Sequence, residues 1–370
     1  MIDALRGRLR EGSIEFGLSV LVALAALAVA SLVVVASGVS PTEGIEALVD
    51  GAFGSDLNLA GTLSKMVPLT LVALAWIVVF RAGRFHVGFP GQLLIGSMFV
   101  SIVALKISLP GIVHLPLTLA AGALGGALYA GIAAWLWAKR GVNEILSTLL
   151  LNLVAVQILA WWVRGPFHDA GSPLPLTEPL PESARWGTIL ERTQLHWDIV
   201  LIPLAVAAVA FLLARTVFGF RIRLVGAGER VARYAGASPE RVGASAIVLS
   251  GALAGLAGSS LVIAGSTPAM GEDPGFAIGF TGIAVALLAR NSPVGAVPAA
   301  LLFAALTQGG GVMEGTVGIS SSLVDFIQGL MIVLVLAATT LLFLARRRRR
   351  AGLGPDATRG AGEPAPRAVA

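Results

Sequence analysis

The chain has 370 residues, of which 56% are hydrophobic and only 13% are charged. Soluble domains carry about 25% charged residues, and a soluble chain of this length would need far more polar surface to cover its core. The composition therefore excludes an ordinary globular enzyme and indicates a protein embedded in a lipid bilayer. The absence of cysteine excludes disulfides, thiolate metal sites and cysteine nucleophiles. The four histidines are scattered, so we expect no metal site and no cofactor.

Ten stretches of about 15 residues or more lack any charged side chain. A membrane-spanning helix needs about 20 apolar residues, and shorter spans are tolerated inside a bundle. We therefore predict an all-α, polytopic integral membrane protein with about ten transmembrane helices. In chain order, the stretches are residues 17–42, 66–80, 85–105, 107–138, 145–163, 199–214, 242–271, 274–289, 291–313 and 326–345.

The orientation of these spans follows from the basic residues, because cytoplasmic loops retain Lys and Arg. With both termini in the cytoplasm, 21 of the 26 basic residues fall on the cytoplasmic side, and the inverted topology would reverse that ratio. We predict a cytoplasmic N-terminus at 1–15, a transmembrane domain at 16–345, and a basic, disordered cytoplasmic tail at 346–370.

Two loops stand out between the predicted spans. The longest outer loop, 164–197, contains five prolines, which favour an extended and partly rigid segment. The longest inner loop, 215–241, is strongly basic. Its charge alone is typical of an ordinary cytoplasmic loop that only sets the topology.

Glycine and proline interrupt two of the apolar segments, at 84–96 and 271–293. Such residues break helices within the membrane and are tolerated where the backbone lines a cavity or packs against neighbouring helices. We predict broken or re-entrant segments there, close to a transport pathway. A third stretch, 250–259, places small residues at 251, 255 and 258, which favours close helix packing.

Motifs for catalysis are missing from the sequence. No Gly-Lys dipeptide occurs, so the chain has no Walker A phosphate loop, and we predict that it is not an enzyme. Carboxylates deep in the membrane would indicate an ion-coupled carrier, but Glu144, Asp198 and Asp325 lie only at the edges of predicted spans. A free-standing secondary transporter is therefore the weaker alternative, although sodium coupling through backbone carbonyls stays open.

The segment FRAGRFHVGFPGQLLIG, residues 80–96, resembles the FRAGLFNIGAEGQ signature of permease subunits of bacterial binding-protein-dependent ABC importers. The resemblance is to the branch that handles nucleosides and simple sugars, which is related to the branched-chain amino-acid permeases. Segments 141–152, 223–242, 250–258 and 279–306 match the same family in the same order. The chain departs from the signature at His86 and at Phe89-Pro90, where Asn and Ala-Glu are usual, which affects the expected cargo more than the fold.

This resemblance implies a permease in a bacterial plasma membrane that forms the pathway for a small polar solute, either a nucleoside or a simple sugar. Branched-chain amino acids are the alternative cargo. The implied partners are a double-cassette ABC ATPase, a second homologous permease and an extracytoplasmic substrate-binding lipoprotein, together with membrane lipid. Hydrolysis of ATP would take place on the ATPase. No nucleic-acid partner is expected.

A pathway for a neutral polar solute needs amide or hydroxyl groups and aromatic rings rather than buried charge. Each such residue is also a common helix-packing residue, so helix packing remains the alternative role. The candidates for the substrate pathway are Phe89, Gln92, Asn152, Gln157, Phe280 and Thr281.

Within the inner loop, a helix over 228–236 would place Val231, Tyr234 and Ala235 on one face. The resemblance assigns this segment to docking on the ATPase, and 139–147 is the next candidate if it does not dock. The candidate coupling residues are Gly228, Glu229, Arg230, Val231, Arg233 and Tyr234.

Overall fold

The computed structural model describes residues 40–265, 269–318, 322, 326 and 329–330. The chain divides into two compact units, residues 31–325 and residues 1–30 with 326–370. All of the helices named below belong to the first unit. The predicted N-terminal segment, the first and last predicted spans and the C-terminal tail lie almost entirely outside the described residues.

The described residues are α-helical apart from connecting segments, two short 3-10 turns and two isolated β-bridges, and no strand occurs among them. Within the described part of the chain, seven helical segments are long and apolar enough to cross a membrane, and α11 is apolar but shorter. The elements are α2 (Pro41–Phe53), α3 (Asp56–Arg81), α4 (Phe89–Lys106), α5 (Gly111–Arg140), α6 (Glu144–Arg164), η1 (Glu182–Ala184), η2 (Trp197–Val200), α7 (Leu201–Arg215), α8 (Val217–Ala227), α9 (Glu229–Tyr234), α10 (Pro239–Ile263), α11 (Phe276–Leu288) and α12 (Ala296–Val317).

Eight of the ten predicted spans coincide with a helix, and the other two lie almost wholly outside the described residues. The count of about ten therefore stays a prediction for the whole chain. Two boundaries differ most from the prediction: α3 begins at Asp56, well before residue 66, and includes Lys65, and α10 ends at Ile263, well before residue 271. The Nζ of Lys65 donates a hydrogen bond of 2.5 Å to Oε1 of Gln308 in α12. Because this bond gives the side chain a polar partner, Lys65 can lie within a helix, whereas the search for charge-free stretches began the predicted span at residue 66.

Helix α10 lies at the centre of this unit and packs against α3, α4 and α5. Glycines make that packing possible: a Cβ on Gly255 would lie 2.1 Å from the carbonyl oxygen of Gly122 in α5, and one on Gly258 would lie 2.3 Å from the carbonyl oxygen of Leu93 in α4. The helix backbones are thus in direct contact, as small residues allow in membrane bundles. The predicted close packing along 250–259 is confirmed.

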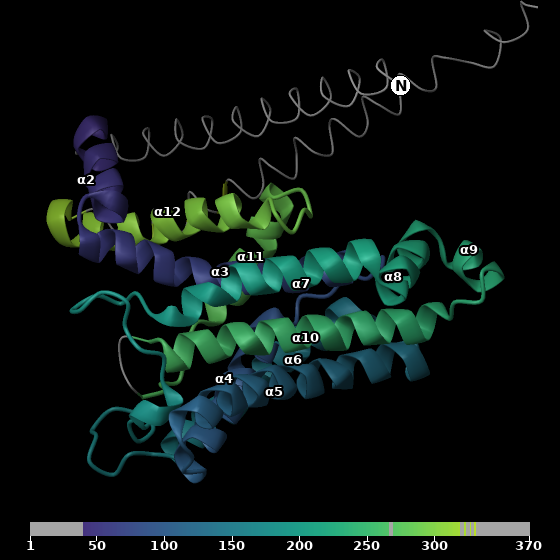
Figure 1. The fold of residues 1–370 in the computed structure, drawn as a ribbon, viewed down its shortest axis with the longest axis horizontal. Helices are drawn as coiled ribbons and strands as arrows, with labels where there is room; N and C mark the ends of the chain where they lie inside the picture. Colours follow the sequence, from purple (N-terminus) through teal and green to yellow (C-terminus); the bar gives the residue numbers. More distant parts are fainter. Residues whose placement is uncertain (1–39, 266–268, 319–321, 323–325, 327–328, 331–370) are drawn as a thin grey trace, which may run out of the picture. The chain divides into compact units, whose positions relative to one another are not determined.

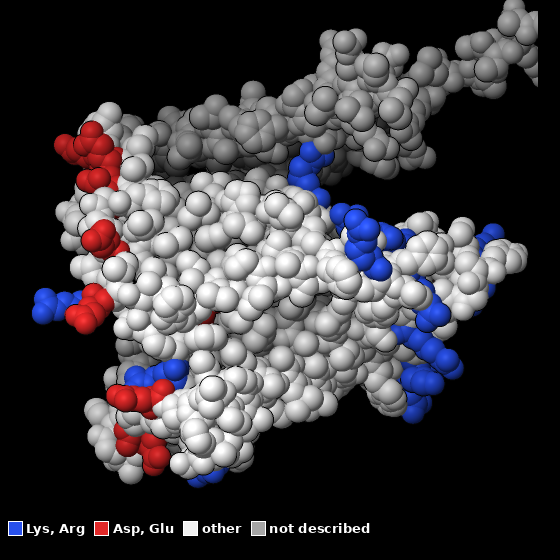
Figure 2. Space-filling model, in the orientation of Figure 1, with Lys and Arg blue, Asp and Glu red and all other residues white. Residues whose placement is uncertain are grey.

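The long helices of this unit run side by side, with α8 and α9 at one end and the segment 165–196 at the other (Figure 1). Basic side chains gather at the α9 end, whereas acidic side chains gather at the opposite end with a few basic ones among them (Figure 2). Such an asymmetry of Lys and Arg is the pattern that sets the orientation of membrane proteins.

The segment 165–196 packs against the bundle. From its prolines, the sequence analysis predicted an extended and partly rigid outer loop. Leu180 and Ala184 are buried, and the backbone N–H of Thr177 donates to the carbonyl oxygen of Met270 at 3.0 Å. The backbone N–H of Trp186 also donates to the carbonyl oxygen of Ile263 at the end of α10, at 3.2 Å. Prolines limit backbone hydrogen bonding within the segment, but they do not prevent these contacts with α10 and with the connection between α10 and α11.

Candidate functional site

The loop between α3 and α4, residues 82–88, turns back into the helix bundle instead of running over the surface. Gly83 provides the turn, with φ at +67°, a conformation that favours glycine. His86 and Phe89 are both fully buried, and Pro90 occupies the first turn of α4, where its missing N–H costs nothing. The interruption predicted in 84–96 falls in this loop, before α4 runs unbroken from Phe89 to Lys106. Whether the segment is re-entrant in the membrane stays a prediction, and we call residues 82–88, which fold inward, the re-entrant loop.

Asn152 of α6 fastens this loop to the bundle. Its Nδ2 donates to the carbonyl oxygen of Val87 at 2.8 Å, and its Oδ1 accepts from the backbone N–H of Gly91 at 2.9 Å. Thr148, one helical turn earlier, accepts from the N–H of Val87 at 3.2 Å. Since buried backbone groups need such partners, Asn152 has a clear structural role in addition to its predicted place in the substrate pathway.

His86 stabilises the same loop from within. Its Nδ1 accepts from the backbone N–H of Gly88 at 3.2 Å, and its Nε2 lies 3.0 Å from the hydroxyl oxygen of Ser250 in α10. The contact to the N–H two residues ahead is the one that an Asn side chain makes in an Asx-turn. Burial lowers the pKa of His86 to about 3, so the ring is neutral at physiological pH.

Two further pathway candidates lie in the interior beside this loop. Phe89 packs its ring 4.5 Å from the ring of His86, measured between centroids. Gln92 is buried in the first turn of α4, and its Oε1 has no hydrogen-bond partner among the described residues. Phe89, Gln92 and Asn152 therefore form one buried group around the start of α4.

The other three candidates lie on α6 and α11, where Gln157 and Phe280 are exposed and Thr281 is half-buried. Gln157 lies five residues after Asn152 on α6, which turns it about 140° away around the helix. Phe280 is 41% exposed, and its ring lies 5.7 Å from that of Phe276 in the preceding turn of α11. The hydroxyl of Thr281 donates to the carbonyl oxygen of Ala277 at 3.1 Å.

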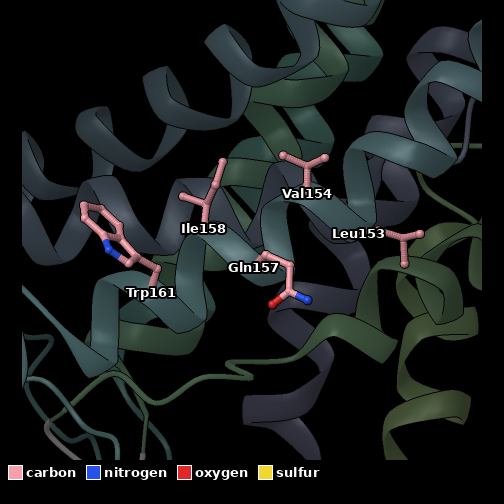
Figure 3. A pocket seen from close by; sticks show the side chains of 5 residues that line it. All are labelled: Leu153, Val154, Gln157, Ile158 and Trp161. Atoms are coloured by element: carbon pink, nitrogen blue, oxygen red, sulfur yellow. The ribbon is translucent and has the colours of Figure 1, made fainter.

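A cavity of about 460 Å³ connects α6 with the beginning of α11. Gln157 and Phe276 line it from the two helices, and Glu272 and Asp273 line it from the segment before α11. Gln157 also lies in a shallow, apolar surface depression along α6, where Figure 3 shows it between Val154 and Trp161. Gln157 therefore lies at both the cavity and the depression, whereas Phe280 and Thr281 lie further along α11 and line neither of them.

Glu272, which lines the cavity, forms an ion pair with α6. Arg164, at the end of α6, donates from Nη2 to Oε2 of Glu272 at 3.0 Å and also contacts the other carboxylate oxygen. The hydrogen bond from Arg164 holds the pKa of Glu272 below its ordinary value. Glu272 therefore presents a carboxylate rather than a carboxylic acid to the cavity.

The inner loop contains two helices, α8 and the six-residue α9. The short helix predicted over 228–236 is confirmed as α9, Glu229–Tyr234. Ala232 is buried against the bundle, whereas Val231 is 55% and Tyr234 93% exposed. Arg230 and Arg233 are also exposed, and Arg233 donates to Glu240 at 2.5 Å.

Arg84 connects this loop with the re-entrant loop, a role that the sequence analysis missed. Its guanidinium contacts the carboxylate of Glu229 in α9 and lies 3.8 Å from that of Glu144 in α6. The same group lies 4.4 Å from the ring centre of Trp137 in α5. No local pattern in the sequence pairs residue 84 with residue 229, so only the fold could reveal the contact.

Comparison with known proteins connects these features with transport. The family model described as branched-chain amino acid transport system / permease component matches residues 58–336. A glucose ABC transporter permease of Haloferax volcanii is 36% identical over 87% of either chain. A guanosine ABC transporter permease of Bacillus subtilis is 32% identical over 84% of this chain and 89% of its own.

A nucleoside ABC transporter permease of Lactococcus lactis is 29% identical over 82% of this chain and 86% of its own. No solved structure matches. The family match covers the whole bundle from α3 to α12, including the re-entrant loop, α9 and α11. The chain is a multi-pass membrane protein and belongs to the family of permease components of the branched-chain amino acid transport system type.

Proposed function

We propose that this chain is the membrane permease subunit of an ATP-driven ABC importer whose cargo is a nucleoside or a simple sugar. The relatives named for guanosine, nucleosides and glucose support this cargo class, because the chain matches most of their length. The ATP would be hydrolysed by a separate double-cassette ATPase, and a second homologous permease and an extracytoplasmic binding lipoprotein would complete the importer.

The observation that carries the proposal is the exposure of apolar side chains on α9. Val231 and Tyr234 are exposed on α9, and α9 lies at the basic end of this unit (Figures 1 and 2). Aromatic anchors of this kind are typical of protein–protein contacts, where they contribute most of the binding energy. A cytoplasmic ATPase is the partner that an importer requires at this end, and Arg230 and Arg233 would lie at the rim of the contact.

The pathway in this proposal runs along the exposed faces of α6 and α11. Gln157, Phe280 and Thr281 offer an amide, an aromatic ring and a hydroxyl, which suit the hydroxyls and the flat base of a nucleoside or the hydroxyls of a sugar. Phe89, Gln92 and Asn152 would support this face from behind by holding the start of α4. The second permease would close the pathway from the other side.

Uptake into membrane vesicles that contain the complete transporter tests the proposal. We expect uptake of radiolabelled guanosine or glucose to require ATP and the separate ATPase subunit. Transport by this chain alone, driven by an ion gradient, would contradict the proposal and favour a secondary carrier. The measurement compares ATP, a non-hydrolysable analogue and an imposed sodium or proton gradient.

Truncating the exposed residues of α9 tests the docking surface. Val231→Ala with Tyr234→Ala should reduce co-purification of the ATPase, because losing an anchor at an interface centre costs on the order of 1–3 kcal/mol. A matched control is Val217→Ala with Phe220→Ala, which removes an exposed valine and an exposed aromatic residue from α8. Equal assembly of both double variants would show that α9 does not dock.

A further inference from the structure

Arg84 lies where four elements of the bundle meet. Its guanidinium contacts Glu229 of α9 and lies near Glu144 of α6 and the ring of Trp137 of α5. Gly243 of α10 leaves the space for this arrangement, since a Cβ there would lie 2.7 Å from the Trp137 ring and 3.5 Å from Cδ of Arg84. The side chain of Arg84 is only 14% exposed, which strengthens its interactions relative to those of a surface arginine.

The backbone makes a second connection at the same place. A Cβ on Gly226 would lie 2.2 Å from the carbonyl oxygen of Arg81, and one on Gly83 would lie 3.2 Å from Cα of Gly226. The end of α8, immediately before α9, therefore packs directly on the backbone at the end of α3. Contact between two backbones leaves little room for independent movement.

From Arg84, a continuous set of contacts leads to the pathway helix. Residues 86–88 are bonded to α6 and α10 through Asn152 and Ser250, so the re-entrant loop and the start of α4 form one body. Pro90, in that first turn, lies against Gly279 of α11, where a Cβ would stand 2.4 Å from its backbone nitrogen. Phe280 and Thr281 directly follow Gly279, so a displacement of the loop must displace them or open the packing.

We propose that Arg84 is the positioning residue that transmits movement of α9 to the re-entrant loop and thereby to α11 in the pathway. This inference rests on the proposed function, in which α9 docks on the ATPase. Through the ion pair between Arg84 and Glu229, a displacement of α9 also displaces the re-entrant loop. The contacts of Arg84 with Glu144 and Trp137 restrict the direction in which its side chain can move. Arg84 itself touches neither the ATPase nor the cargo.

State-dependent labelling tests the proposal without knowledge of the cargo. The chain has no cysteine, so Thr281→Cys provides a single reactive thiol on α11. A small cationic methanethiosulfonate reagent should label it at rates that differ several-fold between the nucleotide-free transporter and the transporter trapped with ATP and vanadate. In an Arg84→Gln background this difference should disappear, while the ATPase still co-purifies at the wild-type level.

Additional variants separate transmission from folding. Glu229→Gln should reduce the ATP-dependent difference, and the double variant with Arg84→Gln should be no worse than Arg84→Gln alone, because both remove the same interaction. Arg221→Gln, which removes an exposed charge from α8 at the same end, should keep the full difference. If Arg84→Gln does not fold, Glu229→Gln carries the test, since Glu229 is half exposed.

Three results would overturn the proposal. Equal labelling in both nucleotide states, including no labelling in either, would mean that α11 does not respond to α9. An unchanged difference in Arg84→Gln or in Glu229→Gln would mean that the ion pair is not needed. If the ATPase no longer co-purified with the Arg84→Gln variant, Arg84 would have a role in docking instead. Failure of the proposed docking itself would be seen in a different experiment, as normal assembly of the Val231→Ala, Tyr234→Ala variant.

Discussion

Gly279 of α11 lies directly against Pro90 at the beginning of α4, so closely that a Cβ on Gly279 would stand 2.4 Å from the proline nitrogen. One turn further, Gly282 makes a similar approach to Val72 of α3, where a Cβ would stand 2.4 Å from Cγ1. The short helix α11 is therefore held between α3 and α4 by two glycines. This contact joins the re-entrant loop to the face that carries Phe280 and Thr281.

We expect Gly279→Ala to lower the thermal stability and the membrane abundance of the protein. The new methyl group meets backbone atoms rather than a flexible side chain, and forced shifts of this kind typically cost about 1–3 kcal/mol. The measurement is the thermal midpoint of the purified protein in detergent.

Gly311→Ala in α12 is the matched control for this prediction. A Cβ at Gly311 meets no described atom within 4 Å, and alanine is the better helix former by about 1 kcal/mol. The control should be as stable as the wild type or slightly more stable. If both variants melted at the same temperature, the close packing of α11 on α4 would be wrong.

Asn152 and Gln157 allow the structural and the pathway roles to be separated on one helix. Asn152→Ala leaves the carbonyl oxygen of Val87 and the N–H of Gly91 without their partner, and each unsatisfied buried group costs about 1–3 kcal/mol. We therefore expect a clear loss of stability and of abundance. Gln157→Ala should leave the thermal midpoint nearly unchanged, because Gln157 is exposed.

Uptake at matched membrane abundance completes this test. Gln157→Ala should raise the substrate concentration needed for half-maximal uptake if Gln157 lies in the pathway. Normal uptake by Gln157→Ala would remove it from the pathway, and a normal thermal midpoint for Asn152→Ala would contradict the role of Asn152 in holding the loop.

Much of the helical architecture could be predicted from the distribution of charge. Charge-free stretches indicate spans because a charged side chain is costly inside the membrane. The same reasoning predicted too short a span for α3, because it treated Lys65 as the end of the span. Lys65 is accommodated in the helix by a hydrogen bond to Gln308, which is distant in sequence. The small residues of α10 correctly predicted close packing. This prediction does not require knowledge of the neighbouring helix, because glycine allows any helix to approach closely.

The arrangement of the site could be predicted only in part. Helix α6 is apolar on all sides, so its sequence does not indicate which face is buried. From the sequence alone, Asn152 and Gln157 are equally good candidates for the pathway. Their difference arises from the re-entrant loop, which lies about 65 residues earlier and faces only one of them. The ion pair of Arg84 with Glu229 likewise depends on how two distant loops meet.

His86 makes the stability of the protein depend on pH in a definite direction. Its pKa is lowered from 6.5 to about 3 by burial, so between these values the unfolded chain binds one proton more than the folded chain. The free energy of unfolding should therefore rise with pH across this interval, by about 1.4 kcal/mol per pH unit, and this contribution should be constant above pH 6.5.

His86→Asn provides the comparison for this dependence, because its side-chain oxygen retains an acceptor for the N–H of Gly88 but does not titrate. The variant loses the contact with Ser250 and should be less stable at pH 7.5. Between pH 7.5 and pH 5, however, its thermal midpoint should fall less than that of the wild type. Parallel curves for the two proteins would show that His86 is not buried in its neutral form.

The two ends of the unit formed by residues 31–325 should lie on opposite sides of the membrane, with the basic α9 end in the cytoplasm. The positive-inside rule gives this orientation, and docking of an ATPase on α9 requires it. Tyr234 of α9 and Leu190 of the segment 165–196 are both exposed, and they mark the two ends. In the cysteine-free chain, Leu190→Cys should react with a membrane-impermeant maleimide in intact cells, whereas Tyr234→Cys should react only after the cells are permeabilised.

The unmodified chain, which has no thiol, is the control for background labelling. Labelling of Tyr234→Cys in intact cells would invert the topology, place α9 on the side where no ATP is available, and remove the basis for both the docking surface and the role of Arg84.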